Sequence, residues 1–283
     1  MREKKSKIFE FIILFFLIIL PFNLKAENVY KSKIVVSGFA LEKIVREIIP
    51  KDKIYLLQPP NAEYHDYVPT PLQWKLIQEA ELVILVGSEP WAEKVYSLRN
   101  NKPVLSLVDK EYSFPDPHLW FDFKRVENLV KKLLTYLKQK EPEKYVIYQK
   151  RAERFINKLN LIKKEIATFK NCKYKKIYIL GHSVYYYLFR NTDIQQITLI
   201  KGHVHGTEPS IKILYKFINE LKKRKVKIAY FTEPEFQKYK KFFEKQGIEV
   251  KYLWSGDVFI KGSYIELIKY NIEEIKKGLL CEE

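Results

Sequence analysis

The sequence predicts an α/β fold of two lobes, each with a mostly parallel sheet flanked by helices, joined by one long linker helix. Short apolar strands alternate with amphipathic helices early in the chain and again in its last third. Between these regions, apolar residues recur only at helical spacing. The chain has 283 residues, of which 47% are hydrophobic, so it can fill the cores of two lobes.

The N-terminal lobe, residues 27–125, contains four short apolar runs bounded by turn residues, as is typical of strands buried on both faces of a parallel sheet. We expect strands over 34–36, 54–57, 82–86 and 104–108, with helices over 41–49 and 72–80. The C-terminal lobe, residues 171–283, repeats this alternation. Its expected strands are 177–180, 197–200, 228–231 and 250–253, with helices over 184–189, 211–221, 238–246 and 264–278.

The segment between the lobes, residues 126–170, is expected to be helical apart from a break near Glu141-Pro142. Its second part, roughly residues 143–169, predicts a helix of about 40 Å at a rise of about 1.5 Å per residue. A helix of this length acts as a rigid strut rather than a flexible linker.

The N-terminus, residues 1–26, has the three parts of a signal peptide: a basic start, an apolar run over 8–22 and a small residue, Ala26, at a plausible cleavage site. A retained membrane anchor is the alternative, but the apolar run is short for a span and Pro21 interrupts it. We therefore expect a periplasmic or otherwise extracytoplasmic protein.

The full chain has a net charge of +17, and removing residues 1–26 takes away five basic and two acidic side chains. A polyanion binder is one function class compatible with the remaining +14. However, no nucleic-acid-binding motif accompanies the charge, and export argues against an intracellular partner. We expect no nucleic-acid partner.

Three of the five histidines follow predicted strands, at the edge where open α/β sheets bind ligands. His65 and His118 belong to the first lobe and His182 to the second, so a shared ligand would lie in the cleft between the lobes. Neutral imidazole is a common zinc ligand, and a fourth ligand or water would complete a tetrahedron. From spacing alone, three unrelated loop histidines remain the alternative.

The two cysteines, Cys172 and Cys281, are far apart in the sequence. In an exported protein they can form a disulfide that closes a long loop, or they can remain free thiols. Their spacing fits no zinc-binding pattern, so we do not assign them as ligands.

Five motifs, in order along the chain, resemble the zinc and manganese substrate-binding proteins of ABC transporters. They lie within about residues 33–276 and are Tyr64-His65-Asp66-Tyr67-Val68-Pro69-Thr70-Pro71, Asp116-Pro117-His118-Leu119-Trp120, Gly181-His182, Glu208-Pro209-Ser210 and Phe231-Thr232-Glu233-Pro234. The resemblance implies two lobes, one metal ion in the cleft, and delivery of that ion to an ABC-type membrane permease. It also implies a binding protein rather than an enzyme, and we expect a monomer.

The resemblance assigns three metal ligands, His65, His118 and His182. A histidine at the third position favours Zn²⁺ as the transported ion, whereas manganese- or iron-binding members tend to have a carboxylate there. The acidic residue that many members use as fourth ligand falls near Trp254 in this chain. The fourth ligand therefore stays open among four side chains and water; the side chains are Asp257, Glu208, Glu233 and His205.

His203 and His205 alternate, so an extended segment would turn both imidazoles to one side. The pair is either an accessory metal-capture site or part of a solvated loop.

A zinc hydrolase is another possible function, because three histidines and a water can also be catalytic. The chain lacks H-E-x-x-H, and the segment 181–185 departs from G-x-S-x-G at its last position. Metal capture without catalysis is the function that the sequence favours.

Overall fold

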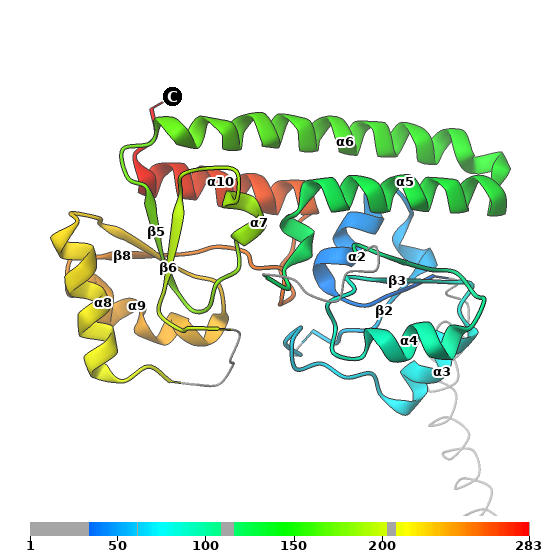
Figure 1. Ribbon diagram of the computed structural model, residues 1–283, viewed down its shortest axis with the longest axis horizontal. Coiled ribbons are helices and arrows are strands. Elements are labelled where there is room, and N and C mark those ends of the chain that lie inside the picture. The colour runs from blue at the N-terminus through cyan, green and yellow to red at the C-terminus, as the bar shows by residue number, and fades with distance from the viewer. Residues whose placement is uncertain (1–33, 61, 109–115, 203–207, 283) are drawn as a thin grey trace, which may run out of the picture.

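The computed structural model describes residues 34–60, 62–108, 116–202 and 208–282. It contains two lobes side by side, each built on a four-stranded parallel sheet (Figure 1). The predicted fold class is therefore confirmed. The segment predicted to be a signal peptide, residues 1–26, lies outside the described residues. None of the described helices is both long and apolar enough to cross a membrane.

The N-terminal sheet has the strand order β2-β1-β3-β4. Its strands are β1 (Ile34–Val36), β2 (Ile54–Leu56), β3 (Leu82–Leu85) and β4 (Val104–Ser106), and its helices are α2 (Phe39–Arg46), η1 (Lys51–Lys53), α3 (Pro71–Glu79) and α4 (Ala92–Arg99). Helix α2 begins two residues earlier than predicted, and the Gln58 side chain accepts a hydrogen bond from the Phe39 N–H at its start. Thr70 and Gln73 form a capping box that fixes the start of α3 just after the His65 loop.

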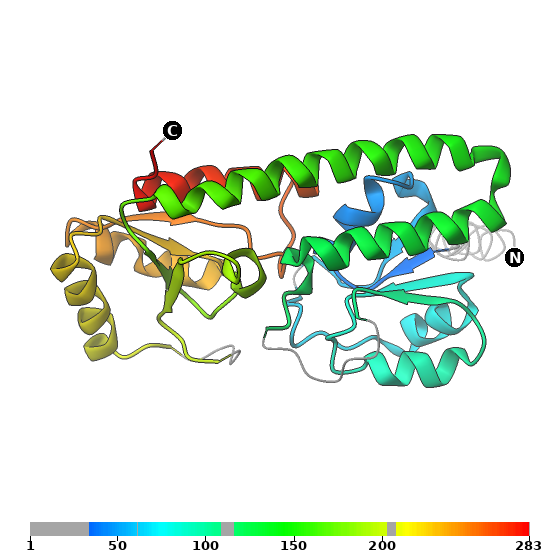
Figure 2. The same ribbon diagram turned by 45° about the horizontal axis from the view of Figure 1, so that its top comes forward.

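The middle segment forms an antiparallel pair of helices, α5 (Phe123–Lys140) and α6 (Tyr145–Ala167), with the short 3₁₀ turns η3 (Pro142–Lys144) and η4 (Thr168–Asn171) (Figures 1 and 2). Helix α6 has 23 residues and is about 34 Å long. It is slightly shorter than predicted because both ends tighten into 3₁₀ turns. It runs from the far end of the N-terminal lobe to the C-terminal lobe (Figure 2).

The C-terminal sheet has the equivalent order, β6-β5-β7-β8. Its elements are β5 (Lys176–Leu180), α7 (Tyr186–Phe189), β6 (Gln195–Thr198), α8 (Ile211–Lys223), β7 (Ile228–Phe231), η5 (Pro234–Tyr239), α9 (Lys240–Glu244), β8 (Glu249–Tyr252) and α10 (Tyr264–Leu279). Two helices are shorter than predicted. Helix α9 follows a 3₁₀ turn. Helix α7 starts two residues later than predicted, and the Val184 and Tyr185 N–H groups before it donate to the Gln196 side chain.

The two lobes are packed together along the helices. Helix α10 lies beside α6 (Figure 1), and one continuous apolar cluster includes residues of β1, α5, α6, β5 and α10. Arg190, at the end of α7, forms a two-pronged ion pair with Asp122, which caps α5. A disulfide joins Cys172 to Cys281, and their Cα atoms are 3.7 Å apart.

Candidate metal centre

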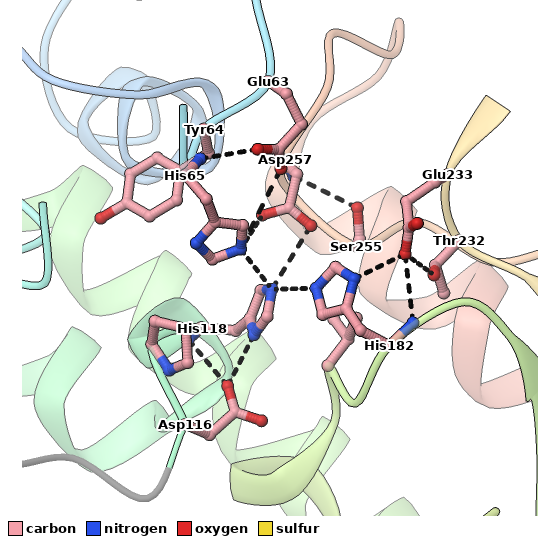
Figure 3. A network of polar contacts seen from close by, with 12 residues as sticks. Glu63, Tyr64, His65, Asp116, His118, His182, Thr232, Glu233, Ser255 and Asp257 are labelled. Atoms are coloured by element: carbon pink, nitrogen blue, oxygen red, sulfur yellow. Dashed lines mark hydrogen bonds and ion pairs between the residues drawn. The ribbon is translucent and has the colours of Figure 1, made fainter. Parts of the chain in front are cut away.

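Four side chains converge between the lobes: His65, His118, His182 and Asp257 (Figure 3). One potential ligand atom from each lies within 4.8 Å of the others. The Nε2 atom of His118 is 3.2 Å from Nε2 of His65 and 3.2 Å from Nε2 of His182. The Asp257 carboxylate lies 3.4 Å from Nε2 of His118 and 3.6 Å from Nε2 of His65. The three imidazoles thus turn the same type of nitrogen toward one carboxylate.

His65 and His118 lie in two loops of the N-terminal lobe that are tied to each other. The Tyr64 hydroxyl is 2.9 Å from Ser88 Oγ, and Ser88 donates to the carbonyl of Pro117. Asp116 Oδ1 accepts a hydrogen bond from the His118 N–H and lies 2.6 Å from Nδ1 of the same histidine. This contact fixes the ring so that Nε2 of His118 faces the centre.

His182 follows β5 of the C-terminal lobe and has an equivalent carboxylate partner. Its Nδ1 atom lies 2.7 Å from Oε1 of Glu233, which also accepts a hydrogen bond from the Thr232 hydroxyl. Gly181 makes this contact possible, because it has φ +142° and a Cβ there would lie 2.6 Å from the Glu233 carboxylate.

Asp257 lies in the connection from β8 to α10 and is fully buried. The Gln58 side chain donates a hydrogen bond to the backbone carbonyl of Asp257 over 2.7 Å. The backbone N–H of Asp257 donates to Ser255 Oγ. Its carboxylate pairs with His118 and His65, at 3.4 and 3.6 Å from their Nε2 atoms. A buried carboxylate needs a positive partner, which a protonated histidine supplies and which a bound cation would supply when the histidines are neutral.

The charges in the centre are strongly coupled. Burial acts to lower the pKa of His118, but the negative charges of Asp257 and Asp116 outweigh it and raise the pKa to about 10. Burial acts to raise the pKa of Asp257. The neighbouring histidines, of which His118 has the largest effect, nevertheless hold this pKa below its usual range. Without metal, a protonated His118 therefore compensates the charge of Asp257.

The other predicted candidates lie elsewhere or outside the described residues. Glu208 is 74% exposed and pairs with Lys238. Glu233 supports His182 from the side facing away from Asp257 (Figure 3). His203 and His205, named as an accessory pair and His205 also as a candidate fourth ligand, lie outside the described residues.

Sequence reasoning did not assign roles to Asp116 and Glu63. Asp116 was visible in the Asp116-Pro117-His118 motif, where a carboxylate two residues before a histidine can bond to its ring. Glu63 accepts a hydrogen bond from the His65 N–H, and burial followed by the charge of Asp257 raises its pKa to about 8. No spacing rule pointed to Glu63, because its position depends on how the loop after β2 turns.

The fold and the centre define a two-lobed binding protein with a His₃Asp cluster between its lobes. Residues 34–278 match the family model of the periplasmic component A of the zinc-uptake complex, and the chain belongs to this family. It is therefore a metal-binding substrate-binding protein of the ABC-transporter type, as the resemblance implied. Members of this family are solute-binding proteins and not enzymes, which confirms that expectation and does not favour the hydrolase.

Individual relatives are more distant. The chain is 26% identical over 285 residues to the high-affinity zinc uptake system protein ZnuA of Bacillus subtilis, covering 89% of both chains. It is 22% identical over 262 residues to the manganese-binding lipoprotein MntA of Halalkalibacterium halodurans, covering 86% of this chain and 85% of that one. The Zn(II)-bound ZnuA-like domain of Streptococcus pneumoniae AdcA superposes with a TM-score of 0.74 at 21% identity, covering 88% of this chain and 99% of that domain.

Proposed function

We propose that this protein captures Zn²⁺ outside the cytoplasm with His65, His118, His182 and Asp257 and delivers the ion to an ABC-type membrane permease. The observation that carries the proposal is the convergence of three Nε2 atoms on one fully buried carboxylate. In this proposal, zinc is the cargo and the four side chains are its ligands.

The spacing of these atoms suits a tetrahedral zinc ion. With Zn–N and Zn–O bonds of about 2.0–2.1 Å, neighbouring ligand atoms of a tetrahedron are about 3.3 Å apart. The four measured separations around His118 and His65 range from 3.2 to 3.6 Å. The carboxylates of Asp116 and Glu233 on two of the histidines add the outer contacts that protein zinc sites commonly have.

The donor set favours zinc over manganese. Three imidazole nitrogens and one carboxylate are typical ligands of Zn²⁺, whereas Mn²⁺ prefers a larger share of oxygen ligands. A manganese- or iron-binding protein of the same family is the second candidate, and the match to the manganese-binding lipoprotein MntA is the observation that supports it.

A competitive metal titration of residues 27–283, stripped with chelator, tests the cargo. At pH 7.5 we expect one tight equivalent of Zn²⁺ that excess Mn²⁺ does not displace, and strong weakening in His182→Ala. The double variant His203→Ala/His205→Ala should bind zinc normally if these residues are not required ligands. Preferential binding of Mn²⁺ would replace zinc as the cargo, and the absence of tight binding by either ion would overturn the proposal.

A further inference from the structure

We infer that the N-terminal lobe, through Gln58 and Trp120, positions the loop of residues 255–262 that carries Asp257. This inference rests on the proposed function, because it concerns how the zinc ligands are held. Along the chain, Asp257 belongs to the C-terminal lobe, between β8 and α10. In space, however, the loop is hydrogen-bonded to the N-terminal lobe. The N-terminal lobe therefore holds three of the proposed ligands, and the C-terminal lobe holds only His182.

Three side chains of the N-terminal lobe donate to backbone carbonyls of this loop. Trp120 Nε1 donates to Ser255 over 2.8 Å, Gln58 Nε2 donates to Asp257 over 2.7 Å, and Lys43 Nζ donates to Gly262 over 2.6 Å. Trp120 and Gln58 are each no more than 1% exposed, and Lys43 is 5% exposed. Buried hydrogen bonds of this kind hold a backbone in one place, because breaking them leaves unsatisfied polar groups.

The backbone at Gly256 lies directly against Trp120. Gly256 has φ +95°, and a Cβ at this position would lie 2.3 Å from the Trp120 Nε1 atom. Only glycine allows so close an approach in this conformation. The backbone of the loop is therefore in direct contact with Trp120 of the N-terminal lobe.

The change from one lobe to the other occurs between Trp254 and Ser255. The carbonyl of Trp254 accepts hydrogen bonds from Tyr185 and Asn271, which belong to the C-terminal half of the chain. The carbonyl of the next residue, Ser255, accepts from Trp120 of the N-terminal lobe. The chain is thus hydrogen-bonded to the C-terminal lobe up to Trp254 and to the N-terminal lobe from Ser255 onward, where Asp257 lies.

His182 is held in the opposite way. Glu233 bonds its ring, and Gln196 accepts hydrogen bonds from the N–H groups of Val184 and Tyr185 just after it. All of these residues belong to the C-terminal lobe. A relative movement of the lobes would therefore change the distance of His182 from the ion and leave Asp257 with His65 and His118.

Double-mutant cycles of zinc affinity test the assignment. Trp120→Phe removes one donor and replaces the indole with a smaller aromatic ring. Gln58→Met removes another donor, together with the bond to the Ala62 carbonyl and the acceptor for the Phe39 N–H. We expect each variant to weaken zinc binding by about 10–100-fold, which is typical when a residue that hydrogen-bonds to a metal ligand is replaced. In an Asp257→Ala background the effect should shrink to less than about threefold, whereas in a His182→Ala background it should persist.

Gln196→Met is the matched control, because it removes a comparable carboxamide on the His182 side. Its effect should disappear in His182→Ala and persist in Asp257→Ala. Equal effects of Gln58→Met and Trp120→Phe in the wild-type and Asp257→Ala backgrounds would overturn the inference.

Hydrogen–deuterium exchange of the metal-free protein separates the inference from the proposed function. Trp120→Phe and Gln58→Met should accelerate exchange in residues 255–262, while Gln196→Met should accelerate it near residues 184–185. Unchanged exchange in 255–262 would overturn the anchoring. If the wild-type protein binds no zinc, the proposed function fails, and this exchange result alone decides whether the N-terminal lobe holds the loop.

Discussion

At the scale of single residues, carboxylates orient two of the histidines in the centre. Asp116 holds Nδ1 of His118 and Glu233 holds Nδ1 of His182, so both Nε2 atoms face the same space. A carboxylate on the far nitrogen also makes an imidazole a stronger ligand. Removing such a partner should weaken metal binding without removing a ligand.

We predict that Glu233→Gln weakens zinc binding by about 10–100-fold, because the amide supports the His182 ring less strongly than a carboxylate does. The measurement is the zinc dissociation constant obtained by competition with a chelator. Glu208→Gln is the control and should change nothing, since Glu208 is exposed and pairs with Lys238. Weaker binding in Glu208→Gln alone would contradict the assignment of these two residues.

Zinc binding is also expected to release a proton. With a pKa of about 10 in the metal-free protein, His118 is protonated at pH 7.5 and must lose this proton before Nε2 can bind a metal. Affinity should therefore fall as the pH falls below 7.5. Calorimetry in two buffers with different ionisation enthalpies should report release of about one proton; a binding enthalpy independent of the buffer would contradict this.

The sequence motifs predict His65, His118 and His182, and the structure brings these three side chains together. The sequence leaves the fourth member open among several candidates. Asp257 could not be singled out because its place depends on a loop that crosses to the other lobe, where it meets Gln58 and Trp120. Sequence spacing describes a residue's own strand or helix and contains little information about such a crossing.

At the scale of elements, the turn between α5 and α6 is held by one carboxylate. Glu141 accepts hydrogen bonds from Lys53, Lys144 and Tyr148. Burial acts to raise its pKa, but these hydrogen bonds outweigh burial and lower the pKa to about 2. The contact with Lys53 joins this turn to η1 of the N-terminal lobe.

A depressed acid pKa contributes stability above the unfolded pKa of about 4.3, and this contribution is lost as the pH falls toward 2. We predict that Glu141→Gln lowers the melting temperature at pH 7. The difference from the wild-type protein should shrink between about pH 4.3 and 2. Thermal unfolding followed by circular dichroism measures both, and an equal difference at pH 7 and pH 3 would show that the charge of Glu141 is not responsible. Glu143→Gln, on the same turn, is the control.

Apolar periodicity predicted the long helices well, since α5, α6 and α10 each bury a continuous stripe of side chains. It was less accurate at α7, which begins at Tyr186 although residues 184–185 have helical spacing. The N–H groups of these two residues donate to Gln196 in β6, a contact that sequence spacing does not reveal.

At the scale of the whole molecule, the disulfide between Cys172 and Cys281 encloses the C-terminal lobe. It joins the end of the helical segment to the end of the chain over a separation of 109 residues. Closing a loop of this length restricts the unfolded chain and is worth about 5 kcal/mol in the chain-entropy treatment.

We predict that Cys172→Ser/Cys281→Ser unfolds at a clearly lower denaturant concentration while its zinc affinity changes little, because Cys172 precedes the start of β5 and His182 follows its opposite end. Urea unfolding of the metal-free protein measures the first quantity and competitive titration the second. Reduction of the wild-type protein should reproduce the loss of stability. A midpoint unchanged by both treatments would refute a stabilising role.

The uneven burial of the four side chains has a kinetic consequence. The His65 side chain is 13% exposed, whereas those of His118, His182 and Asp257 are at most 1% exposed. Under the proposed function, His65 is the ligand that an ion entering from solvent reaches first. We therefore expect substitution of His65 to change the association rate of zinc more than substitution of a buried ligand does, while the dissociation rate depends on all four side chains.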